Sequence, residues 1–111
     1  MGHDVLTAFA TIQAMSNPIR FAILDLVSER EVGAGEIALR FKTTRPAVSQ
    51  HLRILRHAGL VKTRRLGTRR LYSLRRQGFE PLRTYLDGYW SLRLRRLKLA
   101  AEEAERRKRI R

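Results

Sequence analysis

The chain contains no cysteine among its 111 residues. Disulfides, thiolate metal sites and thiol-based redox sensing are therefore excluded. It also lacks any run of about 18 apolar residues, so we expect no membrane span. The N-terminus, Met1-Gly-His-Asp4, has no basic region followed by an apolar stretch, and we expect no secretory signal. Together these absences predict a cytoplasmic protein.

Acidic residues are missing from a long central stretch. None of the ten aspartates and glutamates lies between Ile37 and Phe79, where every charged side chain is a lysine or an arginine. A block of one sign inside a folded domain costs self-repulsion, which a docked polyanion would relieve. The formal net charge of the whole chain is +14. We therefore expect nucleic acid as the partner and a nucleoid-associated location.

Motifs of enzymes are absent as well. The sequence shows no glycine-rich phosphate loop, no nucleophile elbow, no metal-ligand cluster and no carboxylate pair suited to a basic cleft. We expect neither catalysis nor a bound cofactor.

Apolar periodicity predicts one domain, residues 1–111, that is mainly α with a small β-hairpin. Asn17 and Thr44 are expected to cap the second and fourth helices. Gly59 should end the fourth helix, and Gly67-Thr68 should form a type II′ turn. Whether Leu71 or Tyr72 faces the core stays open. The order α-α-α-α-β-β-α, typical of a winged helix-turn-helix, is predicted from helices at 4–15, 18–30, 36–41, 45–58 and 80–107 and strands at 60–66 and 69–74.

The fourth predicted helix has two distinct faces within a DNA-reading head at 36–74. Val48, Leu52 and Leu55 share one face and would anchor the helix to the core. The opposite face carries hydrogen-bonding groups that pair with base edges, glutamine with adenine and arginine with guanine. Free N–H groups at the helix start favour phosphate. The outward-facing residues are Arg45, Pro46, Ser49, Gln50, Arg53 and His57.

Arginines flank the predicted turn of the hairpin on both sides. Arginine at a narrow tip suits phosphates or the minor groove of DNA. The alternative is an edge hairpin that charge protects from aggregation. Because the tip has no acid, we favour DNA contact. The wing residues predicted to contact DNA are Arg64, Arg65, Thr68, Arg69 and Arg70.

The first and last helices, within 1–16 and 80–107, carry more apolar side chains than one small core can cover. A large aromatic-rich patch of this kind is typical of an obligate homodimer interface. A small apolar effector bound at that interface is left open, as is the role of the basic tail at 108–111. The predicted interface consists of Leu6, Phe9, Ile12, Leu82, Tyr85, Leu86, Tyr89, Trp90, Leu94 and Leu97.

Four segments together resemble the ArsR/SmtB family of bacterial winged-helix repressors. They are Asn17-Pro-Ile-Arg-Phe-Ala-Ile-Leu24, Thr44-Arg-Pro-Ala-Val-Ser-Gln-His-Leu-Arg-Ile-Leu55, His57-Ala-Gly-Leu-Val61 and Gly67-Thr-Arg-Arg-Leu-Tyr72. The resemblance implies a homodimer paired through its terminal helices, with the fourth helix in the major groove, and a repressor of transcription. It also implies base-reading roles for Thr44, Arg45, Pro46, Ser49, Gln50 and Arg53. His51 matches the family's histidine, and we expect it to pack or to contact phosphate.

Many members of the family that this chain resembles sense metals, and the chain lacks their metal-binding residues. Their third-helix site uses cysteines, which are absent here. Their last-helix site uses Asp-x-His with a later histidine, whereas this chain has Asp87-Gly-Tyr89 and no histidine after it. A zinc site needs three or four converging ligands. We therefore expect no metal sensor.

Two functions fit these features. The first is a sequence-specific, homodimeric repressor of transcription that binds an inverted repeat in double-stranded DNA. The alternative is a non-specific architectural DNA-binding protein, which shares the positive charge and would explain the basic tail. It does not require Ser49 and Gln50 on an outward helix face. Preference for one inverted repeat over random DNA separates the two.

Overall fold

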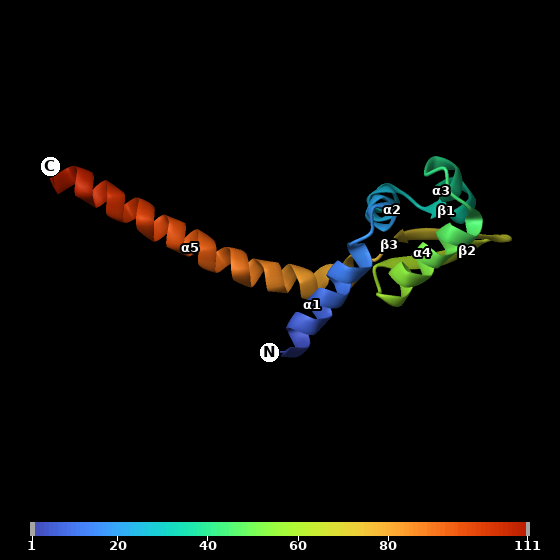
Figure 1. The fold of residues 1–111 in the computed structure, drawn as a ribbon, viewed down its shortest axis with the longest axis horizontal. Helices are drawn as coiled ribbons and strands as arrows, with labels where there is room; N and C mark the ends of the chain where they lie inside the picture. The colour runs from blue at the N-terminus through green and yellow to red at the C-terminus, as the bar shows by residue number, and fades with distance from the viewer. Residues whose placement is uncertain (1, 111) are drawn as a thin grey trace.

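The computed structural model describes the backbone of residues 2–110 and the side chains of residues 5–109. Met1, which the predicted dimerisation helix includes, and Arg111, which the predicted tail includes, lie outside the described residues. Figure 1 shows a head of short helices and strands from which one long helix projects. The elements are α1 (Gly2–Met15), α2 (Pro18–Glu29), β1 (Val32–Gly33), α3 (Ala34–Arg40), α4 (Arg45–His57), β2 (Val61–Leu66), β3 (Arg69–Leu74), the 3₁₀ helix η1 (Arg76–Phe79) and α5 (Glu80–Ile110).

Side-chain caps begin α2 and α4 where the sequence predicted them. Asn17 Oδ1 accepts hydrogen bonds from the backbone N–H groups of Ile19 and Arg20, at 2.9 and 3.2 Å. Thr44 Oγ1 accepts one from the N–H of Ala47 at 3.2 Å. Each cap satisfies donors that have no partner inside the helix. The start of the recognition helix is thereby fixed by its own local sequence.

The sheet has three antiparallel strands in the order β1-β3-β2, whereas the sequence predicted a two-stranded hairpin. The added strand, β1, pairs Val32 with Tyr72 and Gly33 with Leu71. Both faces of β3 are covered: Leu71 is buried, and Tyr72 packs with Leu74 against the core. A strand of two residues has no periodicity of its own, and its pairing depends on β3 far along the chain. For that reason the sequence indicated only a break there.

The core fills the space between α2, α3, α4 and the sheet. Val48, Leu52 and Leu55, the predicted anchors of α4, are all buried. This confirms the predicted division of α4 into an inner and an outer face. Other fully buried side chains in the same cluster are Ile23, Val27, Val32, Ile37 and Leu60.

The last helix, α5, is 31 residues long and reaches three residues past its predicted end. Its beginning packs against α1, and the rest extends away from the head (Figure 1). Every described side chain from Arg83 to Arg109 is exposed. Within residues 2–110, no helix is long and apolar enough to cross a membrane.

Candidate nucleic-acid interface

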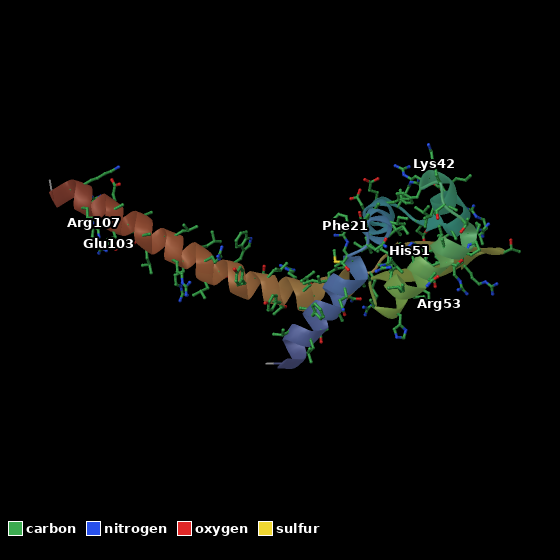
Figure 2. All side chains as sticks on the ribbon, viewed as in Figure 1. Phe21, Lys42, His51, Arg53, Glu103 and Arg107 are labelled. Carbon is green, nitrogen blue, oxygen red and sulfur yellow. The ribbon has the colours of Figure 1, made fainter. Side chains whose placement is uncertain are left out.

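The outer face of α4 presents polar side chains to solvent. Ser49, Gln50 and Arg53 are exposed, and Arg53 points away from the rest of the head in Figure 2. Thr44, Arg45 and Pro46 are exposed at the start of the helix, where the first turn has no acidic residue. This face therefore offers hydrogen-bonding groups and positive charge together. Its predicted role in reading bases stays a prediction.

His51 lies on the flank of α4, half-buried and facing Arg20 of α2. Its Nδ1 is 3.4 Å from Arg20 Nη1. Arg20 also donates from Nε to the Ala14 carbonyl at 2.6 Å and from Nη2 to the Gln13 carbonyl at 3.5 Å. We call this set of contacts the Arg20 clasp, because one side chain of α2 joins α1 to α4. Burial, together with the charge of Arg20, lowers the pKa of His51.

The wing is the hairpin of β2 and β3, closed by a two-residue turn. Gly67 has φ 65°, in the left-handed region that glycine tolerates, while Thr68 does not take a positive φ. This geometry agrees with the predicted type II′ turn. Arg65 and Arg70, one position further from the turn than Leu66 and Arg69, stand directly opposite each other in the register. Like charges in such a pair are unfavourable until an anion neutralises them.

One wing arginine has a partner that the sequence did not reveal. Arg64 donates from Nε and Nη2 to the Glu31 carboxylate, at 2.9 and 2.7 Å. The pairing lowers the pKa of Glu31, chiefly through the hydrogen bond. Glu31 lies just before β1, so the wing is tied to the strand added at the other edge of the sheet. The Arg64 guanidinium is thus paired within the protein. To bind a DNA phosphate, it would have to leave Glu31.

A groove of about 450 Å³ separates the wing from the starts of α3 and α4. Within the part of the chain whose side chains are described, the groove has one acid, Glu36, which is paired with Arg30 through both carboxylate oxygens. The groove brings Arg45 and Ser49 of α4 together with most of the predicted wing residues. It is lined by Gly33, Ala34, Gly35, Glu36, Arg45, Ser49, Arg65, Thr68, Arg69, Arg70 and Tyr72.

The predicted dimer face is exposed on the single chain. Trp90 is 60% exposed and Leu97 66%. The predicted interface residues of α1, Leu6, Phe9 and Ile12, are exposed as well, whereas Leu82 of α5 is half-buried. At the start of α5 lies a largely apolar groove of about 580 Å³, lined by Leu82, Arg83, Leu86, Asp87, Tyr89 and Trp90. Among the side chains of residues 5–109, no three histidines, aspartates or glutamates come together as a metal site.

Comparison with known proteins shows which family this chain resembles in sequence and fold. The model of the bacterial regulatory protein arsR family matches residues 17–63. The HTH-type transcriptional regulator Rv2034 of Mycobacterium tuberculosis is 43% identical over 79 residues, which are 71% of this chain and 74% of that protein. The transcriptional repressor SdpR of Bacillus subtilis is 40% identical over 62 residues, 56% of this chain and 69% of that protein. The solved structure of reduced HlyU from Vibrio cholerae has a TM-score of 0.65 at 35% identity, covering 68% of this chain and 79% of that one.

Proposed function

The chain belongs to the ArsR family of bacterial regulatory proteins, and from this membership we propose that it is a homodimeric repressor that reads an inverted repeat in double-stranded DNA. The coarser statement, a DNA-binding transcriptional regulator, follows from the family itself. Repression is proposed because the similar SdpR is named as a repressor. A regulator of this kind would act on the chromosome, in association with the nucleoid.

The single observation that carries the proposal is the outer face of α4. Gln50 and Arg53 are exposed on a helix whose opposite face is locked into the core. Rigid presentation of glutamine and arginine is what direct readout of base edges in the major groove requires. We propose that Ser49, Gln50 and Arg53 read bases. Arg45, at the exposed start of α4, would contact the DNA phosphate backbone, with Thr44, Pro46 and His51 packing beside it. The wing residues Arg65, Thr68, Arg69 and Arg70 would hold phosphates.

We propose that a second copy of the chain covers the exposed apolar faces of α1 and α5. Each protomer exposes an apolar stripe on both helices, including Phe9, Tyr89 and Trp90. Large exposed apolar patches mark interfaces, and a two-fold dimer would bury the same patch on both protomers. Two copies of α4 would then enter successive major grooves. The half-sites of the operator should lie about 10 base pairs apart in an inverted repeat.

Selection of bound duplexes from a random pool tests the reading function. The expected result is one inverted repeat with the stated spacing, bound roughly 10³-fold or more tightly than random DNA. Equal affinity for selected and random duplexes would refute sequence-specific reading and favour the architectural protein instead. A selected direct repeat or a single half-site would refute the two-fold arrangement.

Sedimentation measures the dimer independently of DNA. We expect a dimer at micromolar concentration and a monomer for Leu94→Glu, because a charge would then lie in the apolar stripe of α5. Leu39→Glu is the matched control, since Leu39 is 83% exposed on α3, away from that stripe. A monomeric wild type, or a dimeric Leu94→Glu variant, contradicts the proposed interface.

A further inference from the structure

Two glycines, Gly33 of β1 and Gly35 in the first turn of α3, lie close to arginine side chains. A Cβ built on Gly33 would stand 3.2 Å from Arg69 Nη2, and one on Gly35 would stand 3.4 Å from Arg45 Nη1. The backbone does not require glycine at the first position, because Gly33 has φ −85° and ψ 157°. Glycine therefore matters here because it has no side chain, rather than because of its backbone conformation.

The two arginines approach these glycines from different elements. Arg69 is the first residue of β3 in the wing, and Arg45 is the first residue of the recognition helix α4. Gly33 and Gly35 are two residues apart, so their Cα atoms are separated by at most about 7 Å. Two guanidinium groups thus lie close to the same short stretch of backbone. Both also line the groove between wing and head.

The electrostatics of the groove favour an anion at this point. Arg45 and Arg69 have no carboxylate partner among the described ion pairs, in contrast to Arg64, which is held by Glu31. Among the described residues that line the groove, Glu36 is the only acid; it is paired with Arg30, and the charge of Arg69 also helps to lower its pKa. Like charges held together in this way are destabilising unless an anion lies between or above them. Guanidinium forks bind phosphate with two directed hydrogen bonds.

We propose that the floor formed by Gly33 and Gly35 seats one strand of the DNA backbone, with Arg45 and Arg69 binding the same phosphate or two adjacent ones. The glycines are positioning residues: they let both guanidinium groups lie low enough to reach into the groove. An alanine at Gly33 would force the end of Arg69 to shift by a few tenths of an ångström, and one at Gly35 would be in direct contact with the end of Arg45 and limit its movement. The inference rests on the proposed DNA-binding function and specifies how one strand is held.

Alanine at each glycine separates positioning from folding. Gly33→Ala and Gly35→Ala should bind duplex DNA about threefold to tenfold more weakly, since a charge-assisted contact is weakened rather than removed. The melting temperature should not fall, and Gly35→Ala should raise it, because alanine favours the helix it lies in. Gly88→Ala is the matched control, as no atom lies within 4 Å of the added Cβ. Glycine variants that bind DNA as Gly88→Ala does would overturn the proposal.

A double-mutant cycle then tests whether each glycine acts through its arginine. In an Arg69→Ala background, Gly33→Ala should cause no further loss of affinity, because the side chain it displaces is gone. The same should hold for Gly35→Ala in an Arg45→Ala background. Additive losses in either cycle would show that the glycines act elsewhere, and the positioning role would be wrong.

Neutral methylphosphonate groups, placed one at a time along a selected duplex, identify the phosphates themselves. Wild-type protein should lose affinity at a few positions, and Arg45→Ala and Arg69→Ala should each lose part or all of this sensitivity at one of them. The proposal requires these two positions to be identical or adjacent on one strand. Positions on opposite strands, or several nucleotides apart, would refute the shared seat while leaving DNA binding intact. A wild type that binds no duplex refutes the proposed function instead.

Discussion

Salt dependence should separate the wing arginine that is paired within the protein from those that are free. Each phosphate neutralised by a cation contributes about −0.9 to the slope of log K against log salt concentration. The groove holds Arg45, Arg65, Arg69 and Arg70, four arginines in each protomer. If each of them binds its own phosphate, a dimer neutralises about eight phosphates, so the slope should be about −7. Between 50 and 200 mM salt the affinity should then fall by roughly 10⁴.

Single substitutions measure how much each arginine contributes to this slope. Arg69→Ala removes two contacts per dimer and should make the slope shallower by about two units. Arg64→Ala should leave the slope nearly unchanged, because Glu31 already holds that guanidinium. Fluorescence anisotropy of a labelled duplex over a series of salt concentrations measures both slopes. Arg107→Ala is the control, since Arg107 pairs with Glu103 near the far end of α5 (Figure 2).

A slope change for Arg64→Ala equal to that for Arg69→Ala would refute this reasoning. It would mean that Arg64 leaves Glu31 when DNA binds and takes up a phosphate. Glu31→Gln would then strengthen DNA binding, because no carboxylate would compete for the guanidinium. If the pairing persists on DNA, Glu31→Gln should instead weaken binding slightly by loosening the wing from β1.

The remaining predictions concern the recognition helix. Gln50→Ala or Arg53→Ala should each cost about 1–3 kcal/mol on the selected site and much less on random DNA in competition assays; equal losses on both would make these residues clamps rather than readers. Leu52→Ala should lower the free energy of unfolding in urea by about 2–5 kcal/mol, because Leu52 is 1% exposed in the core; a neutral effect would contradict that packing. The lowered pKa of His51 means that the unfolded chain binds a proton more readily than the folded one. Stability should therefore fall as the pH drops below about 6.5 and level off below the folded pKa, and His51→Gln should remove this part of the pH dependence.

Local sequence signals were sufficient for most of the head. The caps at Asn17 and Thr44, the apolar face of α4 and the turn at Gly67 each depend on residues within a few positions of one another. Such features are determined by backbone sterics and nearby hydrogen bonds. They were predicted for that reason, and the structure confirms them.

Features that depend on distant parts of the chain were not predicted. The strand β1 exists only because β3 offers it a free edge. The partner of Arg64 lies 33 residues away, and no local pattern links the two. The charge block between Ile37 and Phe79 suggested that every wing arginine was available, whereas an acid from outside the block reaches in. Sequence separation, rather than residue type, set the limit of the prediction.

The Arg20 clasp has a mechanical consequence for the operator. If two copies pair through α1 and α5, the distance and rotation between their α4 helices depend on the joint between α1 and the head. One base pair added between half-sites turns one of them by about 35° relative to the other. A stiff joint makes the dimer intolerant of such spacer changes. Loosening the clasp would widen the set of spacings the protein accepts without altering which bases each half reads.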